Sequence, residues 1–139
     1  GLNVRLPTEA EWERACRAGT STATWLGSNS VSMLDRIAWY SANSDGQTHA
    51  VRGKEPNPYG LHDMLGDVWE WCRDWYSGDA VDAERDPTGP VTGTLRVVRG
   101  ASWSSPASRV RAGQRDAFSP AIHVYDLGFR LAQDQAEAS

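Results

Sequence analysis

The stretch NPYGLHDMLGDVWEWCRDWY, residues 57–76, is the most densely patterned part of the sequence and holds three of its seven tryptophans. From Val68 onward it follows the two-residue period of a β-strand. One strand face carries Trp69, Trp71 and Trp75, and the other carries Val68, Glu70, Cys72 and Asp74. Because the tryptophans share one face, we interpret them as core residues rather than as a sugar-binding platform.

One helix is predicted clearly, in LPTEAEWERACRAG at residues 6–19. Thr8 and Glu11 have the spacing of a capping box, in which each side chain accepts a hydrogen bond from a free amide of the first turn. An apolar stripe follows at helical spacing, formed by Trp12, Ala15 and Cys16. Gly19 then provides a left-handed end to the helix.

The rest of the sequence predicts little regular secondary structure. Residues 20–45 are rich in turn-forming types around a short apolar piece, RIAWY, and residues 77–95 have the composition of a long surface loop. The segment RVVRGASW, residues 96–103, predicts a short strand, and LGFRLA, residues 127–132, predicts a closing strand. The polar residues after 132 are expected to fray.

Composition excludes several classes of protein. The chain has 139 residues, enough for one domain, and a formal net charge of -4 with scattered arginines and a single lysine. No basic patch suggests a nucleic-acid partner, and no apolar run reaches the length of a membrane span. The first residues do not resemble a signal peptide. Cys16 and Cys72 are expected to be buried free thiols rather than a disulfide.

Three blocks in order, RLPTEAEWERACRAG, NPYGLHDMLGDVWEWCRDWY and RVVRGASW with its closing GFRLA, resemble the formylglycine-generating-enzyme family. That family has the sulfatase-modifying-factor type of C-type lectin fold. The resemblance implies a single α+β domain over residues 1–139, loop-rich, with few helices and short antiparallel strands. The family's N-terminal strand and helices have no counterpart here, so we expect a fragment of a longer protein or a minimal version.

The oxidase activity of that family is not expected. The resemblance implies a pair of cysteines after the GASW turn that binds copper and reacts as thiolate. Residues 102–115 here read SWSSPASRVRAGQR and contain no cysteine, so no catalytic residue and no copper are predicted. The related iron enzymes of sulfoxide synthesis need a histidine cluster, which His49, His62 and His123 do not form. The alternatives are a relative of the oxidase or an accessory subunit that lacks the catalytic cysteines, and a structural module of a larger protein.

The order of RVVRGASW, an irregular middle and LGFR also resembles the variable region of proteins diversified by retroelements, here residues 96–130. Copying errors at the adenines of AAC codons reach most amino acids but exclude Lys, Glu, Gln, Met and Trp. The positions that the resemblance marks as variable all carry reachable types: Ser104, Ser105, Pro106, Ser108, Arg109, Asp116, Ala117, Phe118, Ser119, Ile122, Val124, Tyr125 and Asp126. Gln114 is not reachable and would be fixed.

This resemblance predicts a non-enzymatic binding protein. Its ligand would be a protein or a glycan on a cell surface, and the chain itself would sit at a cell surface or on a virion. The mixture of Tyr, Phe, Ser, Asp and Arg resembles an antibody contact surface. Arg111, Arg115, Gly128 and Phe129 would form a fixed frame around it. The alternative is an ordinary loop that no retroelement has altered.

A structural calcium ion is the one cofactor that the family resemblance suggests. The matching positions are the side chains of Asp63 and Glu70 with the backbone carbonyls of Gly66 and Val68. Calcium prefers such a mixture of carboxylate and carbonyl oxygens. Alternatively, Asp63 caps a turn and Glu70 pairs with an arginine, and the sequence leaves both interpretations open.

Overall fold

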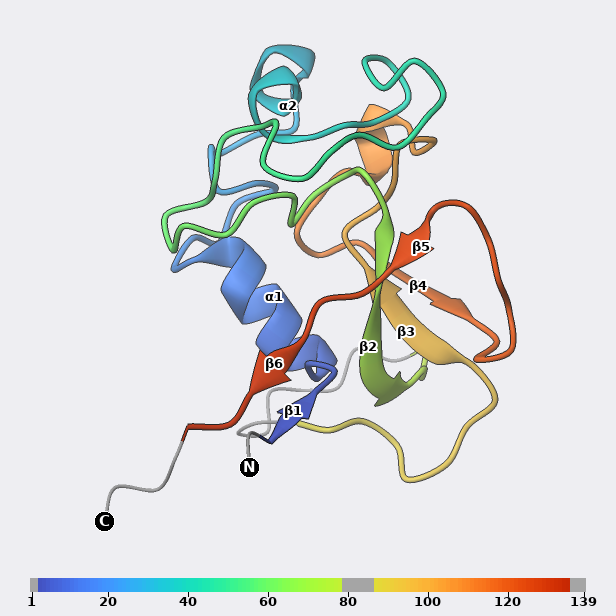
Figure 1. Cartoon of the computed structure of the whole chain (residues 1–139). Coiled ribbons are helices and arrows are strands. Elements are labelled where there is room, and N and C mark those ends of the chain that lie inside the picture. The colour runs from blue at the N-terminus through green and yellow to red at the C-terminus, as the bar shows by residue number, and fades with distance from the viewer. Residues whose placement is uncertain (1–2, 79–86, 136–139) are drawn as a thin grey trace.

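The computed structural model describes residues 3–78 and 87–135 (Figure 1). Within these ranges there are two short α-helices, α1 (Glu9–Arg17) and α2 (Val31–Ile37), and one 3₁₀ turn, η1 (Ala107–Arg109). The strands are β1 (Val4–Arg5), β2 (Trp69–Trp75), β3 (Arg96–Arg99), β4 (Arg115–Phe118), β5 (Leu127–Gly128) and β6 (Ala132–Gln133). Long irregular segments join these elements, which confirms the loop-rich α+β fold.

The main sheet has the strand order β4-β3-β2-β5. The β2–β3 and β3–β4 pairs are antiparallel, as expected, but β5 runs parallel to β2, with Trp69 opposite Leu127. A separate antiparallel ribbon joins β1 to β6, pairing Val4 with Gln133. The predicted closing strand over residues 127–132 is therefore wrong in one respect, since the segment divides into β5 and β6, which belong to different sheets.

Helix α1 forms where the capping box predicts it. The Thr8 hydroxyl accepts a hydrogen bond from the Glu11 amide at 3.2 Å, and a Glu11 carboxylate oxygen accepts one from the Thr8 amide at 2.8 Å. The helix ends one residue before the expected glycine, because Ala18 adopts the left-handed conformation with φ of 48°. Trp12 is fully buried and turns the apolar stripe toward the sheet, where Figure 1 shows α1 beside β2 and β3.

Helix α2 was not predicted from the turn-rich composition of its region. It has only seven residues, and the side chain of its N-cap, Ser30, makes no capping hydrogen bond. Leu34 and Ile37 are fully buried and contribute to the core. A helix this short gains its stability from packing rather than from its own sequence signals.

The alternation in β2 is present, but the tryptophan face is only partly core. Trp69 is buried, whereas Trp71 and Trp75 are half-buried. The opposite face is the more deeply buried one, and it carries Glu70, Cys72 and Asp74. The interpretation of the tryptophans as core residues is thus correct for Trp69 and partly so for Trp71, which packs against the core, whereas Trp75 lies outside it.

Helix α1 supplies the hydrogen bonds that let this polar strand face be buried. The Trp12 indole donates to a Glu70 carboxylate oxygen at 3.0 Å, and the Glu9 amide donates to the Asp74 carboxylate at 2.8 Å. Buried polar groups are tolerated when such partners exist. The first turn and the buried stripe of α1 therefore provide the hydrogen-bond donors that the acidic side chains of β2 need.

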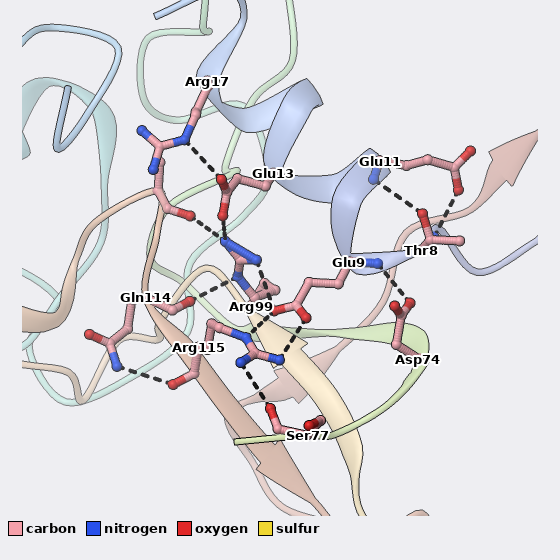
Figure 2. Close-up of polar contacts among 11 residues, drawn as sticks. Thr8, Glu9, Glu11, Glu13, Arg17, Asp74, Ser77, Arg99, Gln114 and Arg115 are labelled. Carbon is pink, nitrogen blue, oxygen red and sulfur yellow. Dashed lines mark hydrogen bonds and ion pairs between the residues drawn. The ribbon is translucent and has the colours of Figure 1, made fainter. Parts of the chain in front are cut away.

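A buried arginine, Arg99 on β3, connects α1 to the segment that precedes β4 (Figure 2). Its side chain is 1% exposed and forms ion pairs with Glu9, at 3.0 Å, and with Glu13. The same guanidinium donates to the backbone carbonyls of Ala112, at 2.7 Å, and Gln114, at 2.9 Å. One side chain thus holds two helix carboxylates and one loop.

Glu9 is shared with a second arginine, Arg115 at the start of β4. The Arg115 guanidinium donates to both Glu9 carboxylate oxygens, at 2.6 and 2.9 Å, and to the Ser77 carbonyl at 3.0 Å. Figure 2 shows the two arginines converging on this carboxylate. Helix α1 and strands β3 and β4 are consequently linked through a single acidic side chain.

Replacing Arg99 with alanine should be strongly destabilising, because Glu9 and Glu13 would lose their buried cation. We expect a loss of about 3–5 kcal/mol in the free energy of unfolding. Arg36→Ala is the control, since Arg36 and Glu55 form an ion pair whose side chains are 51% and 52% exposed. That change should cost about 1 kcal/mol or less. Urea denaturation of both variants measures the difference, and equal losses would contradict the structural role of Arg99.

The pair of Arg5 and Glu11 predicts a pH-dependent contribution to stability. Hydrogen bonds from Arg5, and then from Thr8, lower the pKa of Glu11 to about 2. A lowered folded-state pKa stabilises the protein above the carboxyl's ordinary value of 4.5, and this contribution is lost as the pH falls through about 2.

The variant Glu11→Gln isolates this effect, because glutamine can still accept the capping hydrogen bond from the Thr8 amide. Wild type should be more stable at pH 6, by about 1 kcal/mol or less for so exposed a pair. The difference should shrink steadily as the pH falls from 5 to about 2. Denaturation across this pH range tests it, and a constant difference would refute the assignment.

Candidate contact surface

The candidate variable region, residues 96–130, is fixed to the rest of the fold by backbone hydrogen bonds. The Ser41 amide donates to the Ser105 carbonyl at 3.0 Å, and the Ala112 amide donates to the Ala23 carbonyl at 2.8 Å. At the other end, the Trp69 amide donates to the Asp126 carbonyl at 2.7 Å. These bonds use main-chain atoms, so they hold the path of the chain without specifying most of its side chains.

Most of the predicted variable positions lie at the surface. The exposed ones are Ser104, Pro106, Ser108, Arg109, Ser119, Ile122, Val124 and Tyr125. Four more are half-buried, namely Asp116, Ala117 and Phe118 on β4, and Asp126 before β5. The structure therefore brings the exposed positions to two loops, 104–109 and 119–125.

Ser105 differs from the other predicted positions because it is buried, with 6% of its surface exposed. Its hydroxyl accepts a hydrogen bond from the Ser102 amide at 3.0 Å, while its carbonyl binds the Ser41 amide. Ser105 thus lies beneath the surface and supports the turn.

The two loops meet at a small polar cluster. The Asp126 carboxylate accepts hydrogen bonds from the hydroxyls of Ser102, at 3.0 Å, and Ser104, at 3.4 Å. These two hydroxyls are also 3.0 Å apart. The cluster therefore joins the first loop to the residue at which the second loop ends.

The second loop has an unusually apolar exposed surface. Tyr125 is 95% exposed, and Ile122 and Val124 are 37% and 38% exposed. With the half-buried Trp71 and the exposed Phe129 they line a pocket of about 460 Å³. Figure 1 shows the segment between β4 and β5 on the side of the sheet opposite α1.

Three of the residues expected to form a fixed frame, Arg115, Gly128 and Phe129, have different surroundings in the structure. Arg115 is anchored by its ion pair with Glu9, and Gly128 lies close to Val68, whose Cγ2 would be 3.1 Å from an added Cβ. Phe129, however, is 65% exposed and lines the pocket. Its side chain therefore lies at the candidate contact surface, and its role as a fixed residue of the frame stays a prediction. Its exposure follows from the end of β5 at Gly128.

Of the two cysteines and three histidines, only His123 lines this pocket. Cys16 and Cys72 are buried free thiols, as predicted, and burial raises the pKa of Cys16 to about 12. Ring nitrogens of His49 and His62 contact the backbone carbonyls of Ser44 and Lys54 at 2.6 and 2.9 Å. Neither helix within residues 3–78 and 87–135 is long and apolar enough to cross a bilayer.

Three of the four predicted calcium ligands, Asp63, Val68 and Glu70, line one pocket of about 360 Å³, and Gly66 lies nearby in the chain. One Asp63 carboxylate oxygen accepts a hydrogen bond from the Arg52 amide at 2.8 Å, and the other is buried without a hydrogen-bond partner among the described residues. An orphaned buried oxygen is the feature that a cation ligand would show. Asp67 lines the same pocket, and burial raises the pKa of its carboxyl.

Glu70, by contrast, already has a cationic partner. Arg130 donates to its two carboxylate oxygens at 2.6 and 2.9 Å, and Trp12 donates to one of them. No group of three or more His, Cys, Asp or Glu side chains suited to a metal occurs in the described part of the chain. Asp63 therefore fits a calcium ligand as it stands, whereas Glu70 would first have to leave Arg130.

A family model described as "Sulfatase-modifying factor enzyme 1-like domain" matches residues 2–135. The formylglycine-generating enzyme of Thermomonospora curvata is 38% identical over 149 residues, which cover 94% of this chain and 49% of that enzyme. The serine/threonine-protein kinase pkn1 of Chlamydia pneumoniae is 37% identical over 137 residues, covering 96% of this chain and 21% of the kinase.

Among solved structures, Treponema denticola variable protein 1 superposes with a TM-score of 0.84 at 44% identity. The match covers 92% of this chain and 46% of that one. The present chain thus spans half or less of each of these three proteins. These similarities confirm both resemblances inferred from the sequence motifs.

We propose that calcium binds through Asp63 and the carbonyls of Gly66 and Val68, with Glu70 recruited from Arg130. Calcium should then raise the melting temperature relative to a chelator, as any ligand of the folded state does. Asp63→Asn should abolish this shift, and Arg130→Gln should enlarge it by freeing Glu70. Calorimetry in calcium, magnesium and chelator tests the site, and an unchanged melting temperature in wild type would exclude it.

Proposed function

This chain belongs to the sulfatase-modifying factor enzyme 1-like family, and we propose that it is a non-enzymatic member that binds a ligand through a surface diversified by a retroelement. The ligand we propose is a protein or glycan on a cell surface, with the chain itself on a cell envelope or virion. Support comes from the 44% identity to a variable protein of matching fold. Because one fold hosts many functions, a binding function has to be argued from the residues of the surface.

The observation that carries it is the exposed apolar cluster of Ile122, Val124 and Tyr125. Together with Trp71 and Phe129, these side chains line one pocket. Their loop ends at Asp126, whose carbonyl accepts a hydrogen bond from the Trp69 amide. Exposed apolar clusters of this kind mark interaction sites in monomeric proteins. Rigid aromatic anchors next to adaptable polar residues are also typical of antibody contact surfaces.

The same loop can change its side chains at little cost to the fold. In the residues that the structure describes, Ile122, Val124 and Tyr125 form no side-chain hydrogen bond or ion pair, and they lie outside the buried core. Substitutions at such positions usually change stability by about 0.5 kcal/mol or less. A surface that tolerates substitution while its backbone stays fixed is what diversification requires.

The pocket favours a protein over a glycan as its occupant. Its side chains are mainly apolar, and those able to hydrogen-bond are the Trp71 indole, His123 and the Tyr125 hydroxyl. Burying sugar hydroxyls there without partners would be costly, whereas an apolar side chain of a protein would gain by burial.

The second candidate function is an oxidase, because formylglycine-generating enzymes are among the relatives. Residues 102–115 contain no thiol, and Cys16 and Cys72 are buried. We therefore expect no conversion of a cysteine-containing sulfatase peptide to formylglycine in the presence of copper. Mass spectrometry of the peptide detects the product, and its appearance would favour the oxidase.

The DNA around the coding sequence provides the decisive test of diversification. We expect a reverse transcriptase gene and a near-copy of the segment that encodes residues 96–130, with mismatches confined to adenines of the copy. The mismatched codons should include those of Ile122, Val124 and Tyr125 and should exclude that of Gln114. A locus with neither gene nor copy would refute diversification and leave residues 104–126 as an ordinary loop.

A further inference from the structure

A third pocket shares Trp71 with the pocket of the contact surface. It has a volume of about 600 Å³, and its wall includes Arg5, Leu6, Trp71, Arg73, Arg96 and Pro120. These residues come from β1 and the residue that follows it, from β2 and β3, and from the loop after β4. Three guanidinium groups thus meet around one opening in a chain whose formal net charge is -4.

The charge of Arg5 is already balanced. Every nitrogen of its guanidinium donates a hydrogen bond, to Glu11, Asp134 or the Leu6 carbonyl, at 2.7–3.2 Å. Arg5 therefore shapes the wall of the pocket and offers little to a ligand.

Arg96 and Arg73 are not balanced in this way. Within residues 3–78 and 87–135, neither forms an ion pair with a carboxylate. Arg96 is held in place, because its Nη1 donates to the Arg73 carbonyl at 2.6 Å and its guanidinium stacks 3.5 Å from the centre of the Trp75 ring. Among the residues that the structure describes, the Arg96 guanidinium makes no other hydrogen bond, and Arg73 is exposed.

The rest of the wall is apolar. The Trp71 ring is half-buried, and Leu6 and Pro120 complete the apolar surface around it. A guanidinium recognises a carboxylate through two parallel hydrogen bonds, and an indole face packs against flat apolar groups. The combination of free guanidiniums and an indole wall suits an anion that carries an apolar body.

We propose that this pocket binds a carboxylate attached to an aromatic or other flat apolar group. Arg73 and Arg96 would hold the carboxylate, and Trp71 would cover the apolar part. The pocket contains none of the positions marked as variable, although Trp71 lines both pockets. The proposal does not rest on diversification, and it gives the chain a constant site beside its adjustable one.

Titration with phenylacetate, followed by the Trp71 indole N–H in nitrogen-15 NMR spectra, tests the site directly. We expect a saturable shift that weakens as salt rises, because ionic contacts are screened. Phenylacetamide, the neutral analogue, should bind at least about tenfold more weakly, as expected when charge-assisted hydrogen bonds are lost. Inorganic phosphate tests whether the apolar body is needed, and it should also bind more weakly.

Matched variants connect the binding to the two arginines. Arg73→Ala should weaken phenylacetate binding by about tenfold or more. Arg14→Ala is the control, because Arg14 is also exposed but lies on α1 away from the pocket. Arg96→Lys retains the charge but loses the paired geometry, so we expect an intermediate loss.

A peptide with glutamate next to phenylalanine separates the two sources of such a carboxylate. Tighter binding of the peptide than of phenylacetate would point to a protein segment, and the reverse would point to a free small molecule. The proposal is overturned if phenylacetamide or phosphate binds as well as phenylacetate, if Arg73→Ala and Arg14→Ala behave alike, or if no saturable shift occurs.

Discussion

The burial of one guanidinium, that of Arg99, is the constraint on which the rest of this fold depends. Two carboxylates from α1 and two carbonyls from the segment before β4 surround it. A buried ion pair often adds little net stability compared with apolar packing, but removing one partner is severe. Arg99 therefore fixes where the helix, the central strands and the approach to β4 must lie.

That arrangement separates the molecule into a fixed side and an adjustable side. Helix α1 covers the sheet face that holds Glu70, Cys72 and Asp74, and the loop between β4 and β5 lies on the other side. Glu9 is the shared partner of Arg99 and Arg115, so the start of β4 is positioned from the fixed side. The exposed side chains of the loop that follows β4, among them Ile122, Val124 and Tyr125, lie outside the core.

Much of the fold could be predicted from local sequence patterns. The capping box of Thr8 and Glu11 located α1, and the alternation after Val68 located β2. Helix α2 escaped prediction because its stability comes from burying Leu34 and Ile37, which no local signal reveals. The division of the closing segment into β5 and β6 depends on two different partner strands, β2 and β1.

The site was predictable to a similar extent. The irregular pattern around Ile122 and Tyr125 correctly indicated a surface loop, while the burial of Ser105 depends on partners at Ser41 and Ser102. The cationic pocket gave no sequence signal, because Arg5, Arg73 and Arg96 are isolated in the sequence; the pairing of β2 with β3 brings Arg73 and Arg96 together, and Arg5 comes from a separate sheet.

The parallel pairing of β5 with β2 has a consequence for length as well as for side-chain identity. The loop of residues 119–126 leaves the sheet after Phe118 and returns at Leu127, so both of its ends are held by strands. The free-energy cost of closing a flexible loop, which is entropic, rises by only about 0.6 kcal/mol for each doubling of its length. Insertions here would cost the domain less than one lost core methyl group, so the same frame could present loops of very different reach.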